Sequence, residues 1–262
     1  MPLIVENAFL CGADGLVQSG DQIWVHFQKY PWDLFCQEKN PSEGKHRRII
    51  ESRLRKGLPD PSDASLLSGT YHSGISPHIY SYYHLLTDLL PHLIETPRNR
   101  VLVPEFMPQS FIEFLKQAQF EVKILPKGTV KVEILYIPAM DLPEWNSEKV
   151  KKIQTFFENL LPSNFQAGSN GSIPLNRIYV SRKLAVRRHL SNEDEFMPLL
   201  RKYNFRKFYL EQMTIIEQVK LFRTASHVIA AHGAGLTNIL FAPKNTRILE
   251  IRPELSSGQF CF

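Results

Sequence analysis

The sequence is poor in the features that mark several classes of protein. Its 262 residues include only three cysteines, Cys11, Cys36 and Cys261, which are widely spaced and odd in number. This pattern fits neither a disulfide framework nor a zinc cluster, so we expect a reducing compartment. Its apolar runs, such as 239–242, are far shorter than the ~20 residues that cross a bilayer. No transmembrane segment is therefore expected.

The amino-terminal stretch and the overall composition exclude further classes. No basic stretch followed by a long apolar core opens the chain, so we expect no signal peptide and place the protein in the cytoplasm. The fractions of hydrophobic residues, 43%, and charged residues, 22%, are typical of globular chains. Collagen-like, coiled-coil and disordered structures are excluded, because the chain has no low-complexity bias.

The positive charge is concentrated in one segment. The net charge is +5, yet residues 174–208 carry nine Lys and Arg against three acids. This favours a local anionic ligand such as a phosphate over nucleic-acid binding, which a pI near 9.0 would otherwise suggest. A solvated basic face is the alternative. A second basic stretch, 45–56, allows at most peripheral contact with an inner membrane.

The chain divides into two predicted domains of the α/β class. Residues 162–176 are rich in Pro, Ser, Asn and Gly and predict a linker between a first domain at 1–165 and a second at 174–262. Before the linker, strand and helix patterns alternate, which predicts a parallel sheet. These patterns lie at 100–104, 109–119, 121–125, 130–137 and 147–161.

The alternation is sharper in the second domain. Strands are predicted at 177–181, 207–210, 227–231 and 247–251, and helices at 192–203, 215–224 and from 236 onward. Two helix starts have the capping-box pattern, Asn192 with Glu195 and Thr214 with Glu217. Ligands of such folds bind at the carboxyl ends of the strands, so we expect the site there.

A glycine turn follows the strand at 227–231 and opens a helix. It contains His232, Gly233, Ala234, Gly235 and Asn238. The glycines permit positive backbone dihedral angles and a close approach of ligand, while free amides at a helix start attract an anion. The turn lacks the third glycine of a dinucleotide fingerprint and the lysine of a P-loop. An ordinary tight turn between strand and helix is the alternative.

Charged residues follow two of the neighbouring strands. Glu250 ends the strand 247–251, where it could accept hydrogen bonds from a ribose or pair with Arg247 or Arg252. Arg182 and then Arg187 follow the strand 177–181, and guanidinium groups suit diphosphate oxygens.

Histidines accumulate in the first domain around a predicted helix at 81–90. His84 and Asp88 lie four residues apart and share one face of that helix. Metal binding would need a third ligand, but His72 and His78 are predicted to lie in a loop and no HExxH pattern is present. We therefore expect no metal. The alternatives are a general base, taking a proton from a hydroxyl nucleophile, or an ordinary capping histidine and a surface aspartate.

Together these segments resemble glycosyltransferase family 61 from about residue 71 onward. The resemblance lies in YYHLLTDLLPHL at 82–93, YVSRKLAVRR at 179–188 followed by Asn192 and Glu193, Glu217 with Gln218, and HGAGLTNILFAP at 232–243 with Glu250. It implies a GT-B architecture of two Rossmann-like domains with a cleft between them. It also implies an inverting, metal-independent transfer from a nucleotide sugar, with UDP favoured, to a glycan or other hydroxyl acceptor, in surface polysaccharide biosynthesis.

The resemblance also implies roles for single residues. The donor diphosphate would be held by His232, Gly233, Ala234, Gly235 and Asn238, assisted by Arg182 and Arg187, and the ribose by Glu250. On the acceptor side Asp88 is expected to act as the base, with His84 positioning it. No cofactor is expected.

Two departures from the family pattern stand out. Leu85 occupies a position where many relatives carry an aromatic residue, which is expected to alter the acceptor pocket. The chain ends at Phe262, soon after Glu250, where GT-B enzymes close with a further helix, so we expect a truncated second domain. An inactive remnant that binds nucleotide sugar or glycan is therefore the alternative function.

Overall fold

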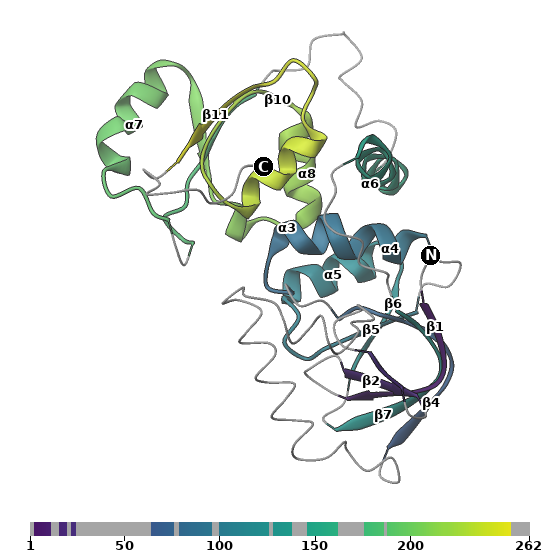
Figure 1. Cartoon of the computed structure of the whole chain (residues 1–262). Coiled ribbons are helices and arrows are strands. Elements are labelled where there is room, and N and C mark those ends of the chain that lie inside the picture. Colours follow the sequence, from purple (N-terminus) through teal and green to yellow (C-terminus); the bar gives the residue numbers. More distant parts are fainter. Residues whose placement is uncertain are drawn as a thin grey trace, which may run out of the picture. The chain divides into compact units, whose positions relative to one another are not determined.

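The chain folds into two compact units (Figure 1). Unit 1 comprises Met1–Tyr80 and His84–Asn146, and unit 2 comprises Ser81–Tyr83 and Ser147–Phe262. The computed structural model describes residues 3–11, 16–19, 22–24, 64–75, 79–95, 100–125, 128–137, 146–161, 176–185 and 188–252. The predicted linker, apart from its last residue, and the basic stretch 45–56 lie outside this range.

Unit 1 is built on a seven-stranded mixed sheet in the order β3-β2-β1-β7-β4-β5-β6. Its strands are β1 (Leu3–Cys11), β2 (Leu16–Ser19), β3 (Gln22–Trp24), β4 (Ser65–Ser73), β5 (Arg100–Val103), β6 (Glu121–Ile124) and β7 (Thr129–Ile137). Neighbours from β7 to β6 are parallel, as predicted, whereas β1 runs antiparallel to both β2 and β7. The mixed α/β class is therefore confirmed.

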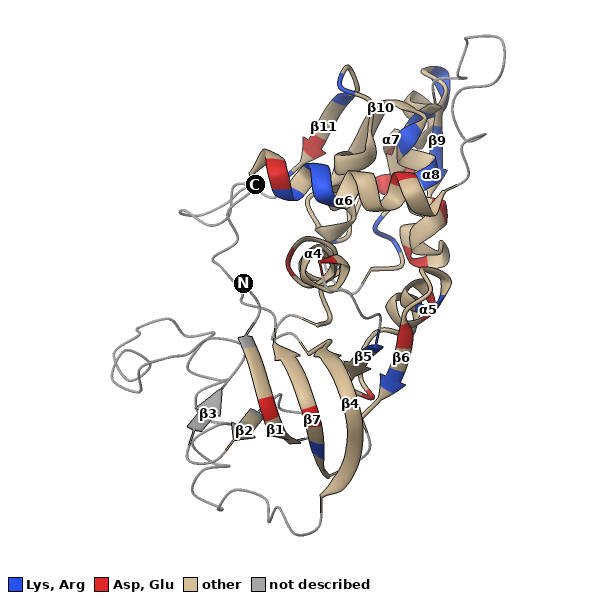
Figure 2. Ribbon diagram, turned by 90° about the vertical axis from the view of Figure 1, so that its right-hand side faces the viewer, with Lys and Arg blue, Asp and Glu red and all other residues tan. Residues whose placement is uncertain are grey.

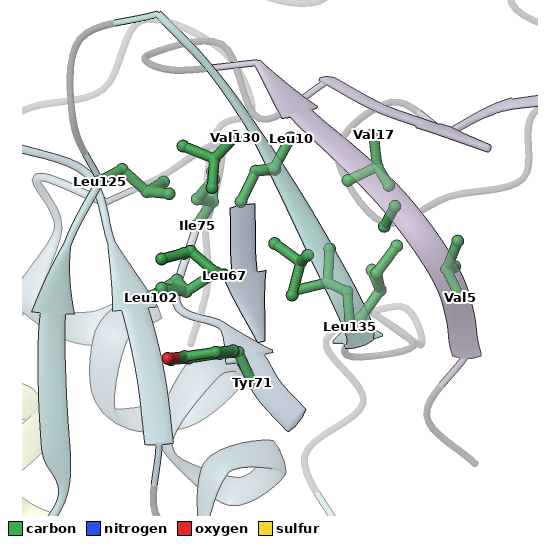
Figure 3. Close-up of a cluster of buried hydrophobic side chains, with 13 residues drawn as sticks. Val5, Leu10, Val17, Leu67, Tyr71, Ile75, Leu102, Leu125, Val130 and Leu135 are labelled. Carbon is green, nitrogen blue, oxygen red and sulfur yellow. The ribbon is translucent and has the colours of Figure 1, made fainter. Parts of the chain in front are cut away.

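A cluster of buried apolar side chains packs along this sheet (Figure 3). Alternating residues of β7, including Val130 and Val132, are fully buried, and Leu10 of β1 and Leu102 of β5 pack in the same cluster. Burial of each such aliphatic side chain stabilises the fold by about 1.5–3 kcal/mol. The cluster fixes the strands whose carboxyl ends carry the functional loops.

The predicted helix at 81–90 is interrupted by a π-helical turn. Helix α3 (Tyr82–His84) passes into the π-helix η3 (Leu85–Leu89) and then α4 (Leu90–Ile94), where the Leu90 amide donates to the Leu85 carbonyl. Pro91 lacks the amide that an uninterrupted ladder would use, and the wider turn precedes it. Helix α5 (Gln109–Gln117) follows β5.

Unit 2 is built on a four-stranded parallel sheet in the order β11-β10-β8-β9. Its strands are β8 (Asn176–Val180), β9 (Phe205–Phe208), β10 (Ala225–Ala231) and β11 (Arg247–Ile251). Its helices are α6 (Ser147–Leu160), α7 (Glu193–Lys202), η5 (Leu210–Gln212), α8 (Ile215–Arg223) and η6 (Ala234–Phe241), and η5 and η6 are 3-10 helices. The predicted alternation of strands and helices is confirmed.

Three details of unit 2 differ from or refine the prediction. Strand β9 begins two residues before the predicted 207–210. The capping box at Thr214 with Glu217 is confirmed, with both reciprocal hydrogen bonds present. The one at Asn192 with Glu195 is wrong, because the Asn192 side chain makes no cap hydrogen bond. The Glu195 amide instead donates to the Asn192 backbone carbonyl.

Charged residues are sparse on the central strands. Figure 2 shows β4 almost free of Lys, Arg, Asp and Glu, and β11 with an acidic segment near its arrowhead, the end at which Glu250 lies. Among the described residues, none of the helices is both long enough and apolar enough to cross a membrane.

Candidate functional site

The strand order of unit 2 defines where a ligand would bind. From β8 the chain crosses to β9 on one side and then returns to β10 on the other side of β8. The carboxyl ends of β8 and β10 therefore flank a topological switch point, which is the ligand site of open parallel α/β sheets. Ser181 and Arg182 follow β8 directly, and His232 and Gly233 follow β10. The predicted site residues of these two loops thus lie at one edge of the sheet.

The guanidinium group of Arg182 packs against the bare Cα of Gly233. A Cβ atom at Gly233 would lie 1.9 Å from Arg182 Nη1 and 2.8 Å from its Cζ. The backbone of Gly233 is extended, with φ 167°, which any residue adopts. The expectation that this glycine serves a positive φ is therefore wrong, and its observed role is to leave room for Arg182.

Gly235 has a related packing role. Its φ also lies outside the left-handed region, so the same expectation is wrong here. A Cβ atom at Gly235 would lie 2.8 Å from Leu210 Cδ1. The absence of a side chain at Gly235 allows η6, which Ala234 begins, to lie close to η5. The helix start is closed by a hydrogen bond from the Leu236 amide to the Gly233 carbonyl, 2.9 Å.

The surroundings of Arg182 disfavour its positive charge. Burial lowers the pKa of the guanidinium, and repulsion from Arg188 lowers it further, while Glu211 partly offsets these effects. Arginine nevertheless stays charged at any physiological pH. A half-buried cation beside a second cation gains free energy when an anion binds, so this edge of the sheet suits a phosphate group.

A histidine and a glutamate meet at the ends of β10 and β11. His232 Nδ1 lies 2.6 Å from Glu250 Oε1, and the two side chains are 15% and 30% exposed. The parallel register that pairs Ala230 with Glu250 places them together, and the His232 amide donates to the Ile251 carbonyl. The carboxylate holds a proton on Nδ1, which leaves Nε2 as the second functional nitrogen of the ring.

A buried network stabilises the loop that carries Arg182. The Glu193 carboxylate accepts hydrogen bonds from Tyr179 Oη at 2.7 Å and Lys207 Nζ at 2.9 Å. Burial alone would raise the pKa of Glu193, but hydrogen bonds from Ser181, Tyr179 and Lys207 outweigh it and lower the pKa. Because Ser181 immediately precedes Arg182, the network fixes the end of β8. Glu193 belongs to the family motif noted in the sequence, but its hydrogen-bond partners Tyr179 and Lys207 lie on two separate strands, β8 and β9, and were not predicted.

The glycine turn is anchored by a second network. Asn238 is completely buried. Its Oδ1 accepts from Tyr82 Oη at 2.7 Å, and its Nδ2 donates to Gln218 Oε1 at 2.9 Å and to the Gly235 carbonyl at 3.0 Å. Gln218 in turn donates to the backbone carbonyls of Leu210 and Met213. The Asn238 side chain is thus engaged inside the protein at both polar atoms.

Unit 1 contains a second histidine and carboxylate pair, whose two members were predicted to share one helix face. His84 Nδ1 lies 2.6 Å from Asp88 Oδ2, and their side chains are 26% and 9% exposed. Thr87 Oγ1 donates to the other carboxylate oxygen of Asp88 at 2.9 Å. The pair spans the start of the π-helical turn, a kind of helix distortion that is frequent at functional sites. Its geometry can hold a histidine in one tautomer and orientation.

Arg187 lies outside the described residues, so its predicted contact with a diphosphate stays a prediction. Among the residues that the structure describes, no group of three or more His, Cys, Asp or Glu side chains could hold a metal ion.

Comparison with known proteins identifies the family. Residues 82–249, well over half of the chain, match the family model described as Glycosyltransferase 61. This match begins at the tyrosine that anchors the glycine turn and ends one residue before the glutamate that pairs with His232.

Two curated relatives are similar to parts of the chain. The EGF domain-specific O-linked N-acetylglucosamine transferase of Drosophila melanogaster is 36% identical over 76 residues, which are 28% of this chain and 14% of that protein. The Beta-1,2-xylosyltransferase RCN11 of Oryza sativa subsp. japonica is 32% identical over 126 residues, 40% of this chain and 24% of that protein. The chain thus matches no more than about a quarter of the length of either relative. The resemblance seen in the sequence is confirmed, and the chain belongs to the glycosyltransferase 61 family.

Proposed function

We propose that the chain transfers a sugar from a nucleotide-sugar donor to a hydroxyl group of a glycan or other acceptor. The observation that carries this proposal is the packing of Arg182 on Gly233 at the switch point of the unit 2 sheet, beside the pair of His232 and Glu250. Membership of the family supports the same activity. A cation and helix-start amides at this place suit the diphosphate of the donor.

In the proposed donor site, some residues contact the nucleotide sugar and others position those residues. Arg182 and His232, with the backbone of Ala234 and its neighbours, contact the diphosphate. Glu250 positions His232 and accepts a ribose hydroxyl with its remaining oxygen. Asn238 positions the turn, because its complete burial and internal hydrogen bonds leave it no face for the donor. The cationic groups neutralise the leaving diphosphate without a metal, and UDP is the favoured nucleotide.

His84 is the proposed general base, with Asp88 as the residue that positions it. This reverses the order favoured from the sequence. Asp88 is buried and both its oxygens are engaged, by His84 and Thr87, whereas the His84 side chain is 26% exposed and its Nε2 is not the atom that meets Asp88. A carboxylate that orients a histidine and stabilises its protonated form is a recurring catalytic arrangement.

The proposed reaction is a single displacement with inversion. As the acceptor hydroxyl gives its proton to His84, its oxygen bonds to the anomeric carbon. The bond from that carbon to the diphosphate oxygen breaks, and its electron pair leaves with the nucleoside diphosphate, which Arg182 stabilises. The names of the two relatives denote an N-acetylglucosamine transfer and a xylose transfer, so either a hexosamine or a pentose fits the proposal. A role in surface polysaccharide synthesis belongs to the same proposal.

Calorimetry with UDP, GDP and CDP tests the donor site. We expect one nucleotide to bind with and without Mg²⁺, and Arg182→Ala to weaken its affinity about 10- to 100-fold through lost charged hydrogen bonds. Lys183→Ala is the matched control, because Lys183 is the next cation on the same loop, is exposed and pairs with Asp194. Equal losses in both variants would indicate nonspecific attraction, and no binding at all would contradict the proposal.

Turnover separates the enzyme from an inactive binding remnant. With a glycan acceptor, the enzyme releases nucleoside diphosphate, and His84→Ala is expected to lower kcat by about 10²- to 10⁴-fold, the usual contribution of a general base. Asp88→Asn is expected to lower kcat less, since it removes a positioning group. Nucleotide affinity should stay unchanged in both variants. Nucleotide binding with no turnover across an acceptor panel would favour the remnant.

A further inference from the structure

Two aromatic rings meet on the surface of unit 1. The ring centroids of Tyr80 and Phe106 lie 5.7 Å apart with the planes inclined by 32°. Tyr80 is 74% exposed, the most exposed of the large hydrophobic residues in the described part of the chain, while Phe106 is half-buried. Phe106 therefore supports one side of a tyrosine ring that otherwise faces water. The Tyr80 ring thus offers an apolar face with a polar hydroxyl at its edge, the combination for which tyrosine is enriched at binding interfaces.

The sheet of unit 1 brings these rings together. Tyr80 lies in the loop after β4, and Phe106 lies in the tight turn after β5, which a hydrogen bond from the Met107 amide to the Pro104 carbonyl closes. The two strands are parallel neighbours, so both loops leave the same edge of the sheet. That edge is where α/β folds bind their ligands.

Gly74 permits the chain after β4 to run close to β5. Its amide donates to the Leu102 carbonyl at 2.7 Å. A Cβ atom at Gly74 would lie 2.9 Å from both that carbonyl oxygen and Val101 Cγ1. The chain that leaves β4 thus runs directly against β5 before it reaches Tyr80, which fixes the position from which the Tyr80 loop departs.

We propose that Tyr80, supported by Phe106, is a platform on which a sugar ring of the acceptor stacks. The apolar face of a pyranose, formed by its ring C–H groups, covers an aromatic face well, and its hydroxyls remain free for polar partners. The exposed Glu105, adjacent to Phe106, is one such acceptor of hydroxyl hydrogen bonds. Naming the ligand as a sugar rests on the proposed function, whereas the site itself rests on the two rings.

The platform lies within reach of the proposed base. Tyr80 precedes His84 by four residues, and both belong to unit 1. Four residues span at most about 14 Å even when fully extended. A short oligosaccharide can cover that distance, so a ring stacked on Tyr80 would present a neighbouring ring of the same chain to His84. The platform is thus a subsite for the acceptor, placed one or two sugars from the reacting hydroxyl.

Saturation-transfer NMR on the full chain tests this subsite without requiring turnover. The probes are the methyl β-glycosides of glucose, galactose, mannose, xylose and N-acetylglucosamine, each titrated separately. We expect at least one to bind, Tyr80→Ala to weaken it about 3- to 10-fold, and Tyr80→Phe to retain it, because the ring rather than the hydroxyl makes the contact. Tyr203→Ala is the matched control, since Tyr203 is a 52% exposed tyrosine in unit 2. It should change nothing.

Nucleotide affinity, measured by calorimetry on the same variants, separates this proposal from the proposed function. Nucleotide binding without binding of any glycoside, or with glycoside binding that Tyr80→Ala leaves intact, would overturn the platform and leave the donor site standing. Glycoside binding that depends on the Tyr80 ring, in a chain that binds no nucleotide, would uphold the platform and overturn the donor site. If Tyr80→Ala weakened attachment to phosphatidylglycerol vesicles while glycoside binding stayed unchanged, the ring would be a membrane contact and the platform would be refuted.

Discussion

Replacing Gly233 with alanine separates two explanations of the glycine turn. A Cβ atom at this position would lie 1.9 Å from Arg182 Nη1, a separation that no structure tolerates, so one of the two groups must move. The backbone is extended and accepts alanine without strain. The guanidinium is the end of a flexible side chain, so it is the group expected to move. We therefore expect Gly233→Ala to fold normally and to displace Arg182.

The expected loss of nucleotide affinity in Gly233→Ala follows from the proposed role of Arg182 in binding the diphosphate. Hydrogen bonds to charged groups contribute about 1.5–3 kcal/mol, so loss of the proposed contact between Arg182 and the diphosphate should weaken nucleotide binding about 10- to 100-fold. The assay is calorimetric titration of the wild type, Gly233→Ala, Arg182→Ala and the double variant, with thermal unfolding as a control for folding. Because both single changes remove the same contact, the double variant should bind within about 0.5 kcal/mol of Arg182→Ala.

Additive losses would refute this reasoning. If Gly233→Ala weakened binding as strongly in the Arg182→Ala background as in the wild type, the glycine would serve the close approach of the ligand itself, as the sequence pattern suggested. Unchanged affinity in Gly233→Ala alone would show that the displaced guanidinium does not contact the nucleotide.

Three further predictions concern the networks that support the proposed donor site. Glu193→Ala should destabilise unit 2 by about 3–5 kcal/mol, because it leaves the Lys207 ammonium and Tyr179 hydroxyl without their buried partner; urea unfolding checks this, and a loss below about 1 kcal/mol would contradict it. The lowered pKa of Glu193 stabilises the fold above its ordinary value of 4.5, so this stability should be lost as the pH falls through the lower folded-state pKa, and Glu193→Gln should abolish that part of the acid sensitivity. Asn238→Ala and Gln218→Ala should each weaken both nucleotide binding and stability, and to a similar extent, because both changes break the same hydrogen-bond network. If only Asn238→Ala lost affinity, and its stability were unchanged, Asn238 would contact the ligand directly.

The elements of unit 2 were predictable because each follows from a local pattern. Short β-rich runs separated by amphipathic segments predicted the strand at 247–251 with its observed bounds. The capping box at Thr214 was also local, since its two partners are three residues apart. The sequence at Asn192 has the same capping-box pattern. In the structure, however, the neighbouring Glu193 side chain is buried and bonds to Tyr179 and Lys207. Those partners belong to other strands, so no local rule could foresee them.

In the candidate site, too, the positions of the residues were predictable from the sequence, whereas most of their hydrogen-bond partners were not. Strand ends and residue types alone predict that Arg182, His232 and Glu250 lie at one edge of the sheet. The pairing of His232 with Glu250 depends on the β10 to β11 register, and the sequence offered nearby arginines as partners of equal merit. For His84 and Asp88, the spacing of four residues anticipated proximity. Burial and the second contact of Asp88 with Thr87 are what distinguish the proposed base from the residue proposed to orient it, and both are properties of the packed unit. The proposed chemistry therefore depends on which side chain remains exposed once each pair has formed, and comparing kcat in His84→Ala with kcat in Asp88→Asn is the most direct way to determine it. If His84 is the base, His84→Ala should lower kcat more than Asp88→Asn does, whereas a larger loss in Asp88→Asn would make Asp88 itself the base.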